Sequence, residues 1–170
     1  MTNYRDYLPE LKSSTLFQDI ADDDLIELLE TIAPPIVHLK AGQPLEIPDK
    51  GNFLIVLRST PAKELQPRRF KYDMPKFGEP GMMMAEIPSL SRFLEFLGQK
   101  PELPFKPKPL DFDLECLKCS GEALTRFYNP KVAPAQSVTL RNFLGILAQK
   151  VMDVRRELFL VKEGRDIFNP

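Results

Sequence analysis

The chain has 170 residues, 43% hydrophobic and 28% charged, a balance that predicts a soluble globular protein with one domain and an appended element. Its 23 basic and 24 acidic residues leave a net charge of −1, which excludes the basic footprint of a free-standing nucleic-acid binder. No apolar run approaches the length of a membrane span and the N-terminus lacks an apolar signal core, so we expect a cytoplasmic protein without membrane contact.

Two short helices are expected near the N-terminus. Ser13 or Ser14 could cap the first, which would run through residues 16–20. Three aspartates, 22–24, then place negative charge in the first turn of the second helix. Its apolar residues fall at i, i+3, i+4 and i+7, which indicates one buried stripe, and a Pro-Pro pair ends it: Leu25, Leu28, Leu29 and Ile32.

The middle of the chain favours short strands. Most of the 17 prolines lie there, and proline opposes long helices. Apolar runs between turn signals predict strands at 36–39, 53–57 and 69–72, and helical spacing predicts a short helix over 89–98. Around Phe112, Leu114 and Cys116, apolar residues alternate with acids, the period of a strand with one buried face.

The last third has the most regular periodicity. Apolar residues recur there at spacings of four and three, which predicts a long helix with a coiled-coil seam that pairs with a second copy of the chain: Leu140, Leu144, Leu147, Val151, Val154, Leu158 and Val161. Phe143, Ile146, Met152 and Phe159 add apolar surface outside that seam. We therefore expect one helix to pack on its own domain and also to form a homodimer.

The segment 80–88 contains a turn glycine, Gly81, followed by Ala85, Glu86 and Ile87. This pattern suggests a short helix whose backbone N–H groups cradle a sugar phosphate. Such a site usually adds an arginine, and no arginine stands where one is expected. The segment therefore indicates ancestry more clearly than a present ligand.

In their order, these elements resemble the cyclic nucleotide-binding domain, the sensor half of bacterial regulators like the cyclic AMP receptor protein. Residues 11–17 look like the family's opening, 39–45 like its glycine turn and 51–57 like its central strand. The resemblance implies a mainly β fold: a β-roll or jelly roll (double-stranded β-helix) with N-terminal helices and a long C-terminal dimerisation helix. It implies a domain over residues 1–133, a helix over 134–163 and a tail over 164–170.

The resemblance also implies roles for residues of the segment 80–88, which we call the cassette. In the family, the glycine and backbone amides hold the cyclic phosphate, and the glutamate binds the ribose hydroxyl; Gly81 and Glu86 match these positions. Ala85 replaces a glycine, and the family's phosphate-binding Arg-Ser/Thr pair, which would fall near residues 103–104, is absent. A buried phosphate without a cationic partner is costly, so we expect no cofactor and do not favour a cyclic nucleotide.

Two hypotheses follow for function. The first is a non-catalytic, dimeric sensor or regulatory module with a degenerate cassette: Gly81, Ala85, Glu86 and Ile87. The alternative is a scaffold or protein-interaction module whose pocket is closed by side chains. The family's regulators continue into a helix-turn-helix domain, and only about ten residues follow the long helix here, so we expect no direct DNA binding.

Catalytic and metal roles have little support. Cys116 and Cys119, the only cysteines, would point to opposite faces of a strand, so neither a redox pair nor a metal site is expected. His38, the only histidine, could ligate haem, but a strand residue with a satisfied ring is the favoured interpretation. No set of nucleophile, base and orienting group is recognisable, so we expect no enzyme.

Overall fold

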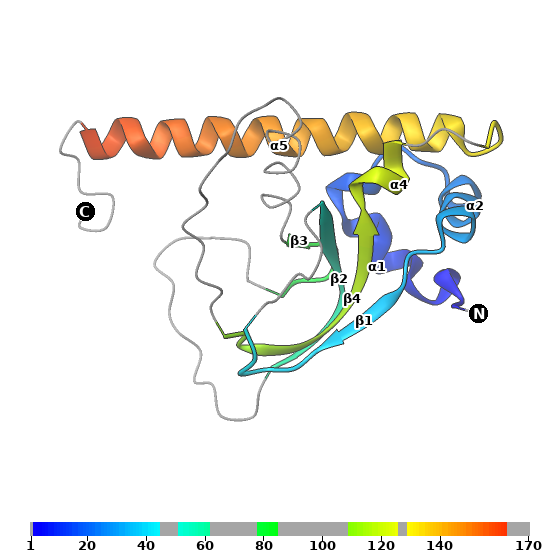
Figure 1. Ribbon diagram of the computed structural model, residues 1–170, viewed down its shortest axis with the longest axis horizontal. Helices are drawn as coiled ribbons and strands as arrows, with labels where there is room; N and C mark the ends of the chain where they lie inside the picture. The colour runs from blue at the N-terminus through cyan, green and yellow to red at the C-terminus, as the bar shows by residue number, and fades with distance from the viewer. Residues whose placement is uncertain (1, 45–50, 62–77, 85–108, 126–128, 163–170) are drawn as a thin grey trace.

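The computed structural model describes residues 2–44, 51–61, 78–84, 109–125 and 129–162. These residues form an antiparallel sheet with helices packed against it (Figure 1). The elements, in chain order, are the 3-10 helix η1 (Tyr4–Tyr7), α1 (Leu8–Ser13), the 3-10 helix η2 (Thr15–Phe17), α2 (Asp22–Ile32), β1 (Ile36–Leu39), β2 (Asn52–Pro61), β3 (Met83–Met84), β4 (Phe112–Ser120), α4 (Gly121–Thr125) and α5 (Ala133–Lys162).

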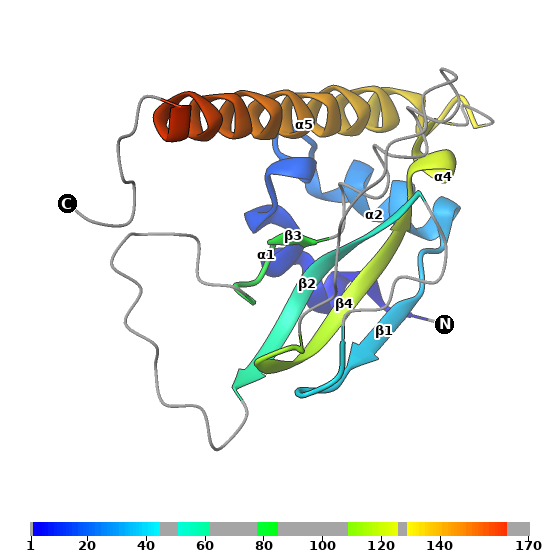
Figure 2. The same cartoon turned by 60° about the vertical axis from the view of Figure 1, so that its left-hand side comes forward.

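The sheet has four strands in the order β1-β4-β2-β3, all neighbours antiparallel. Val56 on β2 pairs with Cys116 on β4, and the register shifts between Val56 and Arg58, which marks a bulge. Figure 2 shows β1, β4 and β2 side by side. The described residues are thus mixed helix and sheet, where a mainly β protein was expected; the expected strand at 69–72 and helix at 89–98 lie outside the described residues.

One face of the sheet packs against the helices. Alternate residues of β2, Phe53, Ile55 and Leu57, are fully buried against apolar residues of α1, η2 and α2. The predicted stripe of α2 is confirmed, because Leu25, Leu28 and Leu29 are buried and Ile32 packs at the margin. Each such side chain stabilises the fold by roughly 1.5–3 kcal/mol through loss of contact with water.

The other face of the sheet forms a second cluster. Its buried members are Leu54, Val56, Met84, Leu110, Leu114 and Cys116, and partly buried apolar residues from β1 and from the segment before β3 pack against them. Both faces of β4 are therefore buried, because Leu117 and Cys119 belong to the first cluster. The alternation around Phe112 to Cys116 predicted only one of these two faces.

The first helix lies earlier than expected. Ser13 or Ser14 was predicted to cap a helix through Leu16, Phe17 and Ile20. Ser14 does stand at the N-cap of η2, but its side chain makes no capping hydrogen bond and η2 covers only Thr15–Phe17, while Ser13 is the last residue of α1. Pro9 stands in the first turn of α1, where its missing N–H costs nothing. Ser13 instead places its hydroxyl oxygen 2.6 Å from the carbonyl oxygen of Glu10 and 3.0 Å from that of Pro80.

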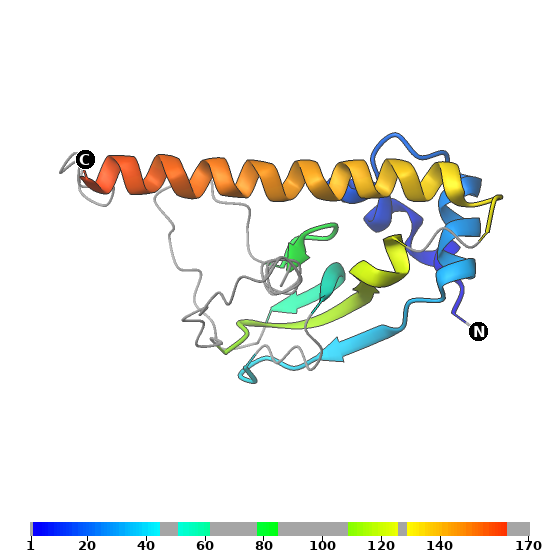
Figure 3. The ribbon, with the colours of Figure 1, turned by 45° about the horizontal axis from the view of Figure 1, so that its top comes forward.

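The long helix α5 crosses the top of the sheet and helices in Figure 1. The N-terminal helices gather beneath its first half, and in Figure 3 its last turns run past the sheet with no other described element beside them. Thr139 on this helix is fully buried, and Val138, Phe143 and Ile146 pack against the helix-side core. Its two halves therefore have different surroundings.

Candidate functional site

The start of the candidate cassette is a tight turn that docks on α1. Gly81 is buried with φ +83°, and its N–H donates to the carbonyl of Val56 at 2.7 Å. A Cβ at Gly81 would lie 2.7 Å from backbone atoms of both Ser13 and Ser14, closer than a real Cβ approaches. Glycine is therefore needed here for the turn and for the close approach of α1.

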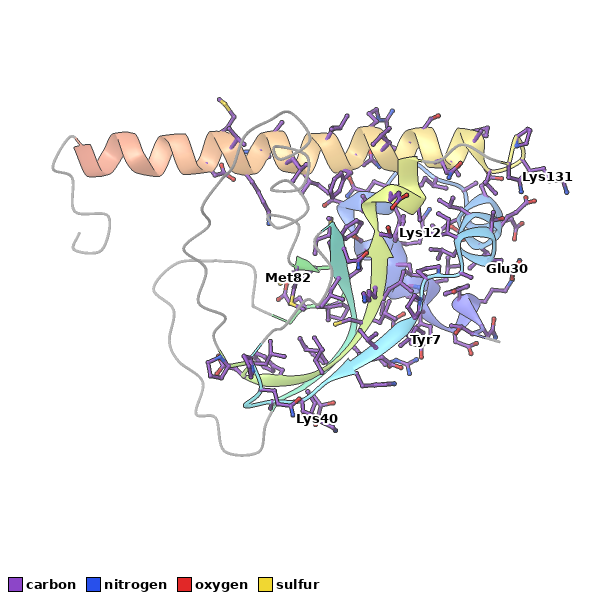
Figure 4. All side chains as sticks on the ribbon, viewed as in Figure 1. Tyr7, Lys12, Glu30, Lys40, Met82 and Lys131 are labelled. Carbon is purple, nitrogen blue, oxygen red and sulfur yellow. The ribbon has the colours of Figure 1, made fainter. Side chains whose placement is uncertain are left out.

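The structure describes the cassette only as far as Met84. Met82 and Met83 are half-buried and Met84 is buried, as expected if methionines fill the interior here. Met82 is labelled in Figure 4, beside the short strand β3. Ala85, Glu86 and Ile87 lie outside the described residues, so their expected ligand roles stay predictions.

The sheet face beside the cassette is apolar. Its buried side chains include Leu54 and Val56 on β2, Cys116 on β4 and Met84 on the edge strand β3. No buried side chain of this cluster carries a charge or a hydroxyl group. A phosphate against these apolar side chains would lose hydration without gaining a partner from them.

Short polar contacts join the cassette turn to α5 through the N-terminal segment. Beyond the contact of Gly81 with Ser13 and Ser14, the next residues form η2, and the side-chain amide of Asn142 on α5 donates to the carbonyls of Leu16 at 3.1 Å and Gln18 at 2.8 Å. Leu16 lies within the short η2 and Gln18 is its C-cap, so both carbonyls belong to a helix end, where carbonyls lack intrahelical partners. A continuous chain of contacts thus runs from the Gly81 turn through η2 to α5.

Aromatic stacking holds α5 against the sheet at Phe143, the residue next to Asn142. The rings of Phe53 on β2 and Phe143 on α5 lie with centroids 5.1 Å apart and planes inclined by 24°. An exposed ion pair at 3.1 Å joins Arg141 on α5 to Asp19, just after η2, and adds little to stability. The first half of α5 is therefore anchored by packing and by hydrogen bonds.

The predicted seam of α5 faces outward in part. Leu144 is 57% exposed and Val151 48%, while Leu140 and Leu147 are half-buried at the flanks. Met152, expected outside the seam, is 61% exposed beside them. The side chains of Val154, Leu158 and Val161 lie outside the described part of the chain. We call Leu144, Val151 and Met152 the exposed strip.

A polar cluster that the sequence did not reveal joins the N-terminus to the sheet. The hydroxyl of Tyr7 donates to Glu115 at 2.8 Å, and the guanidinium of Arg58 lies 4.6 Å from the centre of the Tyr7 ring. Arg58 also approaches the carboxylates of Glu115 at 3.7 Å and Glu10 at 4.0 Å. The hydrogen bond to Glu115, with burial, raises the pKa of Tyr7. This cluster holds η1 and α1 on the sheet.

The cysteines lie on opposite faces of the sheet, as their spacing predicted: Cys116 is in the apolar-face cluster and Cys119 in the helix-side core. Burial raises the pKa of each thiol to about 12, so at neutral pH neither is a nucleophilic thiolate. His38 is exposed on β1, an edge strand of the sheet. Among the described residues, no three His, Cys, Asp or Glu side chains are placed to hold a metal ion.

None of the helices among the described residues combines the length and apolarity needed to cross a bilayer. Comparison with protein-family models gives no match, and comparison with curated proteins finds no similar sequence.

Proposed function

We propose that this chain is a non-catalytic, dimeric sensor or regulatory module of the cyclic nucleotide-binding type, whose cassette no longer holds a phosphate. The observation that carries the proposal is that α5 buries some apolar side chains in its own domain and exposes others. Its first half is anchored on the core through Thr139 and Phe143, while Leu144, Val151 and Met152 remain exposed on the same helix. An exposed row of large apolar side chains favours pairing with another apolar surface.

The sensor role is supported by the contacts between the cassette turn and α5. A ligand that moved the backbone at Gly81 would displace Ser13 and Ser14, because no space separates them. The adjoining η2 would then act on Asn142 through the two carbonyl contacts. In this mechanism the ligand shifts the population of α5 positions, and no chemical step is involved.

The finer architecture belongs to the same proposal. The four-stranded sheet would be one part of a β-roll that spans residues 1–133, followed by the dimerisation helix at 134–163 and a tail at 164–170. Gly81, Ala85, Glu86 and Ile87 would line the ancestral ligand site. The protein would work in the cytoplasm, without binding DNA itself.

A second candidate function is a scaffold that docks on a protein partner and binds no small ligand. The apolar sheet face with Leu54, Val56 and Met84 favours this function, because buried methionine and aliphatic side chains fill the space beside the cassette. The two candidates differ in whether the cassette takes a small ligand and in whether the protein acts by docking on a protein partner.

Ligand titration followed by thermal unfolding tests the ligand part of the proposal. A ligand present at 100 times its Kd stabilises a protein by about 2.7 kcal/mol, which raises Tm by several degrees. We expect cyclic AMP, cyclic GMP and cyclic dinucleotides to leave Tm unchanged. A saturable rise with any of them would show that the cassette still holds the family's phosphate.

A further inference from the structure

The exposed apolar face of α5 does not coincide with the seam that the heptad pattern predicts. Residues three, four and seven positions apart share one side of a helix. The exposed strip shares such a side with Gly145 and Ala148, which are also exposed. Leu140 and Leu147, predicted members of the seam, are half-buried at the flank. The exposed face is therefore centred on Ala148, close to the middle of the 30-residue helix.

This face has a hollow and, about two turns later, a ridge. Gly145 has no side chain, and a Cβ built there meets nothing within 4 Å, so the helix surface is open at this position. Ala148, nearly one turn later, is also small. Val151 and Met152 form the ridge, with 48% and 61% of their surfaces exposed. Two helices pack closely where the side chains of one fill the spaces between those of the other.

Two copies related by a two-fold axis at Ala148 bring the ridge and the hollow together. In such an antiparallel pair, position 145 of one helix lies opposite position 151 of the other, and position 144 lies opposite 152. The ridge of each copy then fills the hollow of the other. In a parallel pair in register, each position lies opposite itself, so the hollow at Gly145 would face a second hollow and stay empty.

The charges at the two ends of α5 are of opposite sign. Residues 2–32, which form the N-terminal helices, contain eight acidic and two basic residues. Residues 148–162 of α5 contain four basic and two acidic residues. The acidic helices lie beside the first half of α5 (Figure 1), where Asp19 pairs with Arg141 at 3.1 Å at the edge of the exposed face. The basic half of α5 runs beyond them (Figure 3).

An antiparallel pair places these unlike charges side by side. The basic half of each α5 lies along the first half of the other α5, next to the acidic helices of that copy. A parallel pair would instead set basic half beside basic half, and like charges in contact are unfavourable. Shape and charge therefore favour the same arrangement.

We propose that two copies of this chain pair through α5 in antiparallel order about a two-fold axis at Ala148, with the basic half of each helix beside the acidic N-terminal helices of the other copy. This inference rests on the homodimer proposed above and adds its orientation and the residues at its centre. The N-terminal helices of each copy then lie next to the α5 of the other copy as well as their own.

The distance between nitroxide labels on the two copies separates the two orders. Ser137 is exposed, lies eleven positions before Ala148 and is changed to cysteine for labelling. Burial raises the pKa of the native thiols Cys116 and Cys119 to about 12, and the unaltered protein treated in the same way is the labelling control. In the antiparallel dimer the labelled positions are about 33 Å apart along the helix axes, at about 1.5 Å per residue. In a parallel dimer the axes are about 8–10 Å apart, and the labels lie within about 20 Å of each other.

Gly145→Leu tests the hollow. The leucine enters open space in its own chain, so the stability of the monomer should not fall, while the Kd of the dimer should rise at least about tenfold because the ridge of the other copy no longer fits. Gln149→Leu is the matched control, at an exposed position about 100° around the helix from Ala148, and it should leave the Kd nearly unchanged. Sedimentation of both variants measures this.

The outcomes distinguish this inference from the proposed function. A label separation near 33 Å, with weaker pairing of Gly145→Leu, would support the antiparallel dimer. A dimer whose labels lie within about 20 Å would overturn the antiparallel order and leave the homodimer standing. A dimer whose Kd is the same in Gly145→Leu would overturn the placement of the contact on this face. A monomeric unaltered protein would overturn the inference and the homodimer together.

Discussion

The two halves of α5 have similar apolar spacing and opposite surroundings. In the first half Thr139 is fully buried, and Phe143 stacks on Phe53. In the second half Val151 is 48% and Met152 61% exposed; Leu144, still in the first half but on another side of the helix from Phe143, is 57% exposed. The comparison teaches that a heptad pattern reports apolar side chains at regular intervals, but not whether their own domain or another chain covers them.

Removal of an anchoring side chain should give the largest loss of stability. Phe143→Ala deletes the ring that stacks on Phe53, and we expect the free energy of unfolding to fall by about 2–4 kcal/mol. Met152→Ala, at an exposed position of the same helix, should change it by less than about 0.5 kcal/mol. Urea unfolding of both variants at one low protein concentration measures this; equal losses would mean that the two halves do not differ.

The turn that supports the anchored half can be tested with a pair of glycines. Gly81 and Gly42 both have positive φ, but a Cβ at Gly42 meets nothing within 4 Å. Gly42→Ala should therefore cost only the backbone term, about 1 kcal/mol. Gly81→Ala must also displace Ser13 and Ser14, so we expect about 2–4 kcal/mol. Unfolding curves that give the same loss for both would refute the tight docking of α1.

A smaller effect is expected from pH at the turn far from α5. The N–H of Ala41 donates to Asp113 at 2.9 Å, and this bond, together with Lys40, lowers the pKa of Asp113 below 3.8. The folded state thus favours the carboxylate: its contribution is present above the unfolded pKa and is lost as pH falls through the folded pKa.

Asp113→Asn isolates that contribution. The variant should be slightly less stable than the unaltered protein at neutral pH, and the difference should shrink as pH falls through the lowered folded-state pKa of Asp113. Urea unfolding across this range measures it, and the association state at neutral pH, which we propose depends on α5, should not change. A difference that persists undiminished in acid would show that the Ala41 contact does not depend on ionisation.

The sequence predicted what is local and periodic. The stripe of α2 and the presence of a long C-terminal helix follow from spacings of three and four residues, the strand around Leu114 follows from alternation, and the strand at Phe53 follows from a continuous apolar run. The start of α1 was missed because Ser13 and Ser14 are good capping residues by type, whereas the Ser13 hydroxyl lies within hydrogen-bond distance of the carbonyls of Glu10 in its own helix and of the distant Pro80.

Contacts between distant residues could not be read from the pattern. Tyr7 and Glu115 are 108 positions apart, and in the sequence Glu115 is only one of the acids that alternate with the apolar residues around Leu114. A cleft lined by Thr31, Ser120, Ala123 and Gln136 arises where α2, β4, α4 and α5 meet, so it could not be predicted from any single segment. The cassette was found by spacing, but its glycine also serves packing against α1, a role that depends on tertiary structure.

Sedimentation equilibrium tests the central claim, that the exposed strip pairs two copies of the chain. We compare the unaltered protein with Leu144→Lys/Val151→Lys, which places charge at two exposed positions, and with Ser137→Lys/Gln149→Lys, a control at exposed polar positions of the same helix. We expect a dimer for the unaltered protein and the control, and a monomer with unchanged Tm for the first variant. A monomeric unaltered protein, or a dimer that persists with both lysines, would contradict the account.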